Sequence, residues 1–275
     1  MLRFARERPL GAAGGLLVLV MTVAAVFAGS IAPYDPLQFH YDAALAPPGR
    51  DFLFGTDNFG RDILSRVIWG ARTSLYVGVG SVLLGQVGGG ALGLVSAYLG
   101  GKLDLVAQRV VDVAMVFPSL VLALVIVAAL GSSINNVIVA IAISQAPGAA
   151  RTIRSTVLSI KQNDYVEAAR ATGCSSVRIM FGHIWPNCTS VLLIVASASL
   201  AHSILSEASL SFLGLGVPPP NPSWGGMMSG EGRRYLVLAP WIALSPGIAI
   251  SLAVLGFNLL GDALRDIWDP RSRGR

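Results

Sequence analysis

QNDYVEAARATGCSSVRIMFGHIWPN, residues 162–187, is a long polar interval in an otherwise apolar chain. The pattern predicts two short helices joined by a sharp turn. Asp164 is placed to cap the first helix, and Glu167 can reach back to the Asp164 backbone N–H, as in a capping box. Gly173 follows where the end of a helix favours a residue with positive φ. The first helix is therefore expected to have about two turns.

The second helix of this stretch begins and ends at residues with known positional preferences. Ser175 or Ser176 can cap it, and Pro186 is expected to end or kink it. In the first helix, the small pair Ala168 and Ala169 leaves a surface that another protein could approach closely. From residue types alone, a solvated connector helix explains the same pattern equally well.

The composition outside this stretch is that of an integral membrane protein. Of the 275 residues, 53% are hydrophobic and 13% are charged, and the mean hydropathy is +0.65. A soluble domain usually carries about 25% charged residues. The net charge of +5 could indicate a nucleic-acid partner, but the basic residues lie in loops between apolar runs. Membrane lipid and the positive-inside rule explain them better, so no nucleic acid is expected.

Apolar runs predict an all-α protein with six transmembrane helices. The run 113–150 has no charge and is too long for one crossing of a core of about 30 Å, so we divide it at 131–136. With the N-terminus inside, most of the 20 basic residues are cytoplasmic. We therefore expect both termini and the 162–187 stretch to be cytoplasmic, with that stretch between helices 4 and 5. The runs are 9–34, 73–101, 113–150 (two spans), 188–216 and 235–261.

The second run contains a glycine repeat. Gly85, Gly89 and Gly93 form a small-residue face that lets helices pack closely in lipid. Gly88, Gly90 and Gly93 also satisfy G-x-G-x-x-G, but no strand precedes them and the setting is a membrane helix. We therefore expect no ATP site, and no other cofactor site, in this chain.

A polar excursion at residues 35–72 precedes the second run. Its last part predicts an interfacial amphipathic helix with one apolar and one polar face. Asp62 and Arg66 are spaced as a supporting ion pair on the polar face. The apolar face is formed by Ile63, Leu64, Val67 and Ile68, and the polar face by Arg61, Asp62, Ser65 and Arg66.

Two ionisable residues lie inside an expected span, and such residues are functional candidates. Glu207 lies roughly 28 Å along the helix from Cys188, near the outer interface. It could belong to a transport pathway or gate, or it could pack against a neighbouring helix near the headgroups. His202 lies deeper, where a hydrogen-bonded structural histidine is the simpler alternative to a pathway residue.

Enzymatic and metal-binding functions find little support in these residues. His202, Ser206 and Ser209 share one helix, but the sequence has no G-x-S-x-G motif. Cys174 and Cys188 flank a stretch expected in the cytoplasm, where a disulfide is not favoured, and two thiols do not make a metal site. We expect no catalytic and no metal-ligating residues.

Several motifs resemble permeases of ATP-binding cassette (ABC) importers. Glu167-Ala168-Ala169, Gly173 and Pro186 resemble their EAA loop, and His183-Ile184-Trp185-Pro186-Asn187 resembles the H-I-L-P-N ending of the dipeptide/oligopeptide branch (DppC/OppC type), with Trp185 in place of the usual Leu. Residues 55–75 and several motifs between 207 and 270 also resemble that branch. The resemblance implies that this loop docks into the ATPase. The ATPase-coupling residues would be Asp164, Tyr165, Glu167, Ala168, Ala169, Gly173 and Pro186.

The resemblance also implies the partners and the organisation of the chain. It predicts a permease that is not itself an enzyme and forms half of a pathway for di- or oligopeptides in a bacterial inner membrane. The partners would be a homologous second permease, two ATP-binding cassette subunits that bind ATP and Mg²⁺, and an extracytoplasmic substrate-binding protein. Residues 1–72 would hold the first span and an outer loop, 73–262 a five-helix core including the coupling loop 151–187, and 263–275 a cytoplasmic tail.

Other functions stay open at this point. Nickel, glutathione and haem importers share the motifs of this branch. A secondary transporter would need ionisable residues at the membrane midplane for ion coupling, and the spans offer almost none. A purely structural membrane subunit would not need a capped docking helix.

Overall fold

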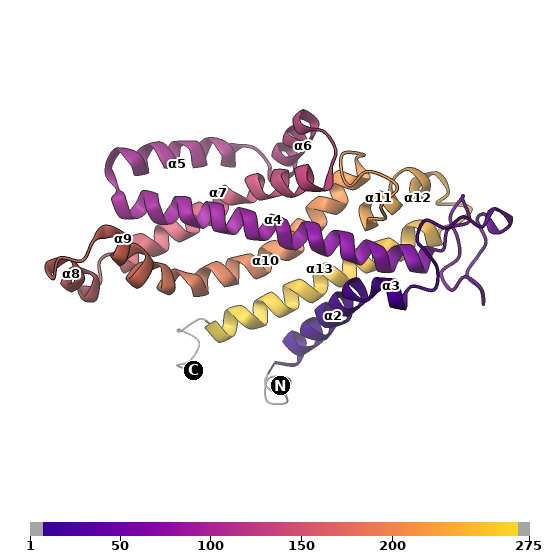
Figure 1. The fold of residues 1–275 in the computed structure, drawn as a ribbon, viewed down its shortest axis with the longest axis horizontal. Helices are drawn as coiled ribbons and strands as arrows, with labels where there is room; N and C mark the ends of the chain where they lie inside the picture. The colour runs from indigo at the N-terminus through magenta and orange to yellow at the C-terminus, as the bar shows by residue number, and fades with distance from the viewer. Residues whose placement is uncertain (1–7, 269–275) are drawn as a thin grey trace.

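The computed structural model describes residues 8–268, and these residues form helices and connecting loops without a β-strand (Figure 1). The basic residues Arg3 and Arg6 and most of the expected tail lie outside this range. The helices are α2 (Pro9–Val26), α3 (Ala28–Ile31), η1 (Tyr41–Ala43), α4 (Ile63–Leu99), α5 (Gly101–Val116), α6 (Ser119–Leu130), α7 (Ile134–Ile160), α8 (Asp164–Ala171), α9 (Ser176–Ile179), η2 (Met180–Ile184), α10 (Trp185–Phe212), α11 (Trp224–Met228), α12 (Gly230–Arg234) and α13 (Trp241–Trp268).

The long helices lie side by side and define two ends of the molecule. In Figure 1, α4, α7, α10 and α13 run along the long axis. Helices α8 and α9 lie at one end, which we call the inner end. Helices α3, α11 and α12 and the loop 32–62 lie at the other, which we call the outer end.

Four described helical segments are long and apolar enough to cross a membrane, and a bent pair makes a fifth candidate. The expected fourth span, in α7, is not among them. The candidates are Pro9–Val26, Ile63–Leu99, Ser176–Phe212, Trp241–Ile267 and the pair Gly101–Val116 with Ser119–Leu130.

The charge-free run 113–150 breaks at two places rather than one. Gly131 ends α6 with φ +85°, and Ser133 caps α7 by accepting a hydrogen bond from the Asn136 N–H at 3.1 Å. This confirms the expected division. A second bend of 94° separates α5 from α6 at Pro118. Proline lacks the N–H that would continue the helix, so the expected third span is not one straight helix: residues 113–116 belong to α5 and residues 119–130 form α6.

The expected interfacial helix is not a separate element. Asp62 caps α4 by accepting from the Ser65 N–H at 2.8 Å, and the helix then continues unbroken to Leu99. The expected polar face is not solvated, because all four of its residues are buried, as is Ile63 of the expected apolar face. Asp62 does not pair with Arg66. Arg66 instead lies 3.8 Å from the carboxylate of Asp57, so this expectation is wrong.

The glycine repeat of α4 packs directly against α7, as expected. A Cβ atom on Gly89 would lie 2.3 Å from the carbonyl oxygen of Ala146, and one on Gly93 would lie 2.3 Å from that of Ala150. Both distances are far below van der Waals contact. Only glycine therefore allows the two backbones to approach this closely.

Candidate functional site

The helix that carries the expected coupling residues, α8, starts at a different residue from the predicted one. The N-cap of α8 is Asn163, and no side chain caps the helix by a hydrogen bond. Asp164 is already the first helical residue, so the expected capping box with Glu167 is wrong. Both carboxylates lie in the first turn, where their charge favours the positive end of the helix dipole.

The turn after α8 has the expected geometry. Gly173 has φ +79°, and Ser175 accepts from the Arg178 N–H to cap α9. Pro186 does not end the second helix. A π-helical turn, η2, precedes it, and Pro186 lies in the first turn of α10, where a missing N–H is tolerated. The second helix therefore continues into the membrane-spanning α10.

One face of α8 is packed and the other is free. Val166 is fully buried and Ala169 is 9% exposed, and both join a hydrophobic cluster with Leu94 and Ile153 of α4 and α7. The other proposed coupling residues are exposed. The small pair is thus divided, since Ala168 faces outward and Ala169 faces inward. The exposed residues are Asp164, Tyr165, Glu167, Ala168, Gly173 and Pro186.

The ring of Tyr98 attaches this loop to the end of α4. The Lys161 ammonium and the Arg170 guanidinium each lie 5.6 Å from the ring centroid. The Lys161 Nζ also donates to the Tyr98 carbonyl oxygen at 2.7 Å. These contacts position α8 against the end of α4.

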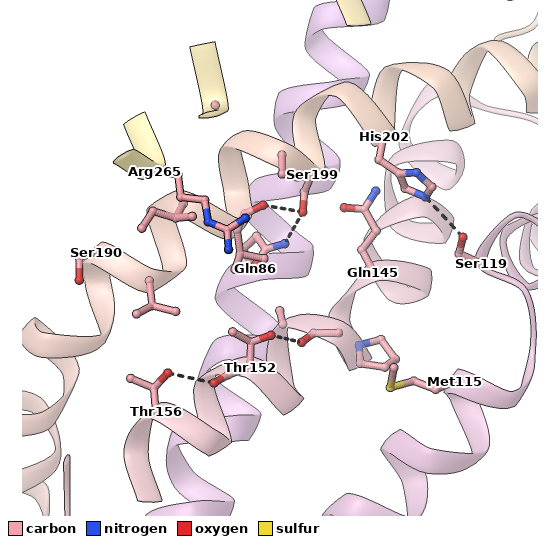
Figure 2. Close-up of a pocket in the computed structure, with 18 of the residues that line it drawn as sticks. Gln86, Met115, Ser119, Gln145, Thr152, Thr156, Ser190, Ser199, His202 and Arg265 are labelled. Atoms are coloured by element: carbon pink, nitrogen blue, oxygen red, sulfur yellow. Dashed lines mark hydrogen bonds between the residues drawn. The ribbon is translucent and has the colours of Figure 1, made fainter. Parts of the chain in front are cut away.

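A cavity of about 1240 Å³ is the second candidate site. Its walls are formed mainly by α7, α10 and α13, with contributions from α4 and α5 (Figure 2). It extends from Ser119 and His202 to Tyr165 and Asn187 at the inner end. The amide of Asn187 donates to the Tyr165 hydroxyl at 3.4 Å. The cavity therefore reaches the helix that carries the expected coupling residues.

Neutral hydrogen-bonding side chains line the middle of this cavity (Figure 2). Gln86 Nε2 donates to Ser199 Oγ at 3.0 Å, and Gln145 Nε2 donates to Ser203 Oγ at 2.8 Å. Neither glutamine was predicted from the sequence as part of a site. An isolated amide in an apolar helix is not distinguished by charge or spacing. The signal that could have identified Gln86 and Gln145 is the occurrence of a polar amide side chain inside an expected membrane span.

The two ionisable candidates lie in different surroundings. His202 lines the cavity, with its Nε2 atom 3.4 Å from Ser119 Oγ. Glu207 is fully buried outside the cavity lining, and its carboxylate accepts from Ser74 at 3.0 Å and from Ser211 at 2.8 Å. The structure therefore does not bring the two residues into one site. The contacts of Glu207 join α10 to α4.

A buried charge cluster at the outer end was also not foreseen. Arg61 donates to Asp57 at 2.6 Å and to both carboxylate oxygens of Glu231, at 3.0 and 3.1 Å. Its guanidinium also lies 4.9 Å from the ring centroid of Phe59. Burial raises the pKa of Glu231 above its usual range, and the charge of Arg61 opposes part of that rise. The cluster attaches the loop 32–62 to α12.

Comparison with known proteins identifies the fold and the family. The family model of binding-protein-dependent transport system inner membrane components matches residues 89–274, and that of the N-terminal transmembrane domain of oligopeptide transport permease C matches residues 1–48. A solved structure of the MetNI methionine ABC transporter in an inward-facing conformation aligns with a TM-score of 0.60. It covers 75% of this chain and 97% of the other at 18% identity, so it shows the fold alone.

Close sequence relatives have bacterial transport names. A peptide transport system permease protein of Brucella suis is 44% identical, over 94% of this chain and 86% of the relative. The glutathione transport system permease protein GsiD of Escherichia coli O1:K1 is 44% identical, over 99% and 89%. GsiD of Pectobacterium atrosepticum is 43% identical, over 98% and 89%. The chain therefore belongs to the family of binding-protein-dependent transport system inner membrane components and is the permease subunit of an ABC importer.

Proposed function

We propose that this permease moves di- or oligopeptides across the inner membrane and that the cavity between α7, α10 and α13 is its half of the pathway. The observation that carries the proposal is the extent of the cavity, which reaches from His202 to Tyr165 on α8. One relative is named for peptides and two for glutathione, which is itself a small peptide. A glutathione importer is therefore the second candidate.

In this proposal α8 transmits the work of ATP hydrolysis to the cavity. The exposed face of α8 binds an ATPase, and the contact between Tyr165 and Asn187 joins that helix to α10. Two separate ATP-binding cassette subunits bind ATP and Mg²⁺ and hydrolyse ATP, while this chain makes no covalent bond. A homologous second permease completes the pathway, and an extracytoplasmic binding protein delivers the cargo.

We propose six spans with both termini in the cytoplasm, α7 being the fourth crossing. The experiment labels single cysteines with a membrane-impermeant maleimide in intact cells, in a background in which Cys174 and Cys188 are serine. A cysteine at Gln162 should resist the label and one at Pro220 should react. The reverse pattern would overturn both the orientation and the docking of α8.

The transport proposal is tested with the complete complex in proteoliposomes. We expect ATP-dependent accumulation of a labelled peptide such as trialanine, and glutathione, nickel and haem are measured in parallel. Accumulation of glutathione alone would favour the second candidate. Accumulation of nickel or haem without either peptide would overturn the proposal.

Coupling through α8 is tested in the same vesicles. Glu167→Lys reverses the charge in the first turn of α8 without touching the membrane-spanning helices. We expect normal permease abundance, weaker ATPase binding, and a parallel decrease in hydrolysis and uptake. Wild-type uptake in a Glu167→Lys, Gly173→Val double variant would mean that this loop does not couple the two reactions.

A further inference from the structure

The inner end of α4 is attached to α7 through the side chain of Lys161. Gly100 and Gly101 have φ values of +68° and +59°, so α4 ends here with carbonyl groups that lack partners inside the helix. Lys161 follows α7 directly, and its Nζ atom donates to the Tyr98 carbonyl at 2.7 Å and to the Ala97 carbonyl at 3.4 Å. Lys161 thus supplies a charged donor to the negative end of the α4 dipole. These bonds hold the inner ends of α4 and α7 together.

The side chain of Tyr98 also contacts α8. Tyr98 is 7% exposed and belongs to the hydrophobic cluster that contains Val166 and Ala169 of α8. Arg170 lies four residues after Val166, on the same face of the helix, and its guanidinium lies 5.6 Å from the centroid of the Tyr98 ring. Within the described residues this guanidinium has no hydrogen bond and no ion pair. The tyrosine ring is therefore the contact that orders the Arg170 side chain.

A contact with an aromatic ring is significant for a helix as short as α8. This helix has eight residues and no side-chain cap, and helices of this length are marginal without tertiary contacts. Its buried side chains, Val166 and Ala169, are small. The stacking of a guanidinium on a ring adds an electrostatic attraction that apolar packing lacks. Arg170 therefore fixes the orientation of α8 relative to α4, in addition to the contact of Tyr165 with α10.

We infer that Tyr98 is a positioning residue for coupling, because its ring holds α8 through Arg170 in a fixed orientation against the inner ends of α4 and α7. The inference rests on the proposed coupling through α8 and adds the residue of the membrane-spanning helices that receives it. Tyr98 is not among the described residues that line the cavity, so it acts without touching the cargo. Since the backbones of α4 and α7 are in close contact at Gly89 and Gly93, a force applied at Tyr98 acts on both helices.

The experiment measures the amount of trialanine accumulated per ATP hydrolysed, with the complete complex in proteoliposomes and saturating loaded binding protein. Tyr98→Leu keeps an apolar side chain in the cluster but removes the ring. We expect the ratio to decrease about two- to five-fold, because the orientation of α8 loses the equivalent of one exposed cation–π contact. The exposed carboxylates of Asp164 and Glu167 are unchanged, so ATPase subunits should still bind and hydrolyse ATP. Tyr98→Phe keeps the ring and should have the wild-type ratio.

Arg170→Met removes the guanidinium from the same contact and should decrease the ratio by a similar factor. Because both changes break one contact, the Tyr98→Leu, Arg170→Met double variant should have no lower ratio than the single variants. Arg178→Met is the matched control, because Arg178 is also an exposed arginine in the last turn of its helix, α9, but stacks on no ring within residues 8–268. It should keep the wild-type ratio. Arg170 is exposed, so Arg170→Met tests the inference even if Tyr98→Leu does not assemble.

Stimulation of ATPase activity by loaded binding protein verifies assembly of each variant. A wild-type ratio in assembled Tyr98→Leu or Arg170→Met, an equal loss in Tyr98→Phe, or additive losses in the double variant would overturn the role of the ring while leaving coupling through α8 in place. Failure of the wild type to accumulate trialanine would instead count against the proposed function.

Discussion

The two ends of this permease are held together by different means. At the inner end, the apolar packing of α8 comes from Val166 and Ala169, and Asp164 and Glu167 on its other face are exposed. At the outer end, Arg61 is bound to two carboxylates, and Trp241 Nε1 donates to the Thr56 carbonyl at 3.0 Å. The outer end thus satisfies its polar groups internally, whereas the carboxylates of Asp164 and Glu167 at the inner end are exposed.

This difference is consistent with the proposed coupling of the inner end to ATP hydrolysis. The contact between Arg61 and Glu231 joins segments 170 residues apart in the sequence, so the outer end is closed by long-range bonds. At the inner end, α8 is held by apolar packing and by the stacking of Arg170 on Tyr98, rather than by ion pairs within the described residues. A partner that binds α8 can therefore move it without breaking buried ion pairs.

The largest effect on stability is expected when the charge cluster of the outer end is disrupted. Arg61→Met removes the nearer charge partner of the fully buried Asp57 and leaves Arg66 at 3.8 Å. Removing one partner of a buried pair costs about 3–5 kcal/mol. The variant should have a clearly lower unfolding temperature in detergent. Arg72→Met, which removes an exposed guanidinium stacked on Trp69, should leave that temperature nearly unchanged. Equal decreases of the unfolding temperature in the two variants would contradict the view that the Arg61 cluster stabilises the outer end.

A smaller effect is expected at the turn of the inner end. Gly173 and Gly182 both have open space where a Cβ would lie, but only Gly173 has a positive φ. Gly173→Val should therefore cost about 1–3 kcal/mol of local strain. Uptake and ATPase binding should decrease together at normal permease abundance, while Gly182→Val should resemble the wild type. Wild-type uptake in Gly173→Val would remove this turn from the coupling route.

The cap of α9 gives a finer test of the same end. Ser175 accepts from the Arg178 N–H at 3.4 Å, whereas Ser176 is the first helical residue and makes no such cap. Ser175→Ala should cost about 1 kcal/mol of local helix stability. We expect faster amide hydrogen exchange in α9 and a modest decrease in uptake. Ser176→Ala is the control, and exchange that is equally fast in both variants would rule out the cap as the cause.

The smallest effect is expected at Glu207. Glu207→Gln keeps an acceptor for one serine and adds an amide that can donate to the other, so the contacts with Ser74 and Ser211 can both be retained. Uptake should stay within a few-fold of the wild type. Loss of uptake in an assembled complex with normal ATPase stimulation would instead assign Glu207 to the pathway or gate.

Local features of the fold were largely predictable from the sequence. The positive φ of Gly173, the cap at Ser175 or Ser176 and the close packing of Gly89 follow from rules that act within one or two helical turns. The error at Asp164 is of the same kind. Asn163 is an equally good capping residue, and sequence rules rarely separate neighbouring candidates.

Long-range features were not predictable. Arg61 and Arg66 read as the polar face of a surface helix because their partners, Asp57 and Glu231, lie in a loop and in a distant segment. The cavity glutamines Gln86 and Gln145 carry no charge, and their hydrogen-bond partners are serines of another helix, α10. A pairwise contact between distant segments leaves no periodic signal in a single sequence.

The glycine contacts between α4 and α7 have a mechanical consequence. Since no side chain separates Gly89 from the Ala146 carbonyl, these helices cannot rotate or slide past each other without a steric clash. They should therefore move as one rigid body, and α8 follows α7 after a connection of only residues 161–163. A displacement of α8 by an ATPase would then tilt α4 and α7 together. The resulting displacement at the outer ends of these two helices would depend on their length and not on bending within them.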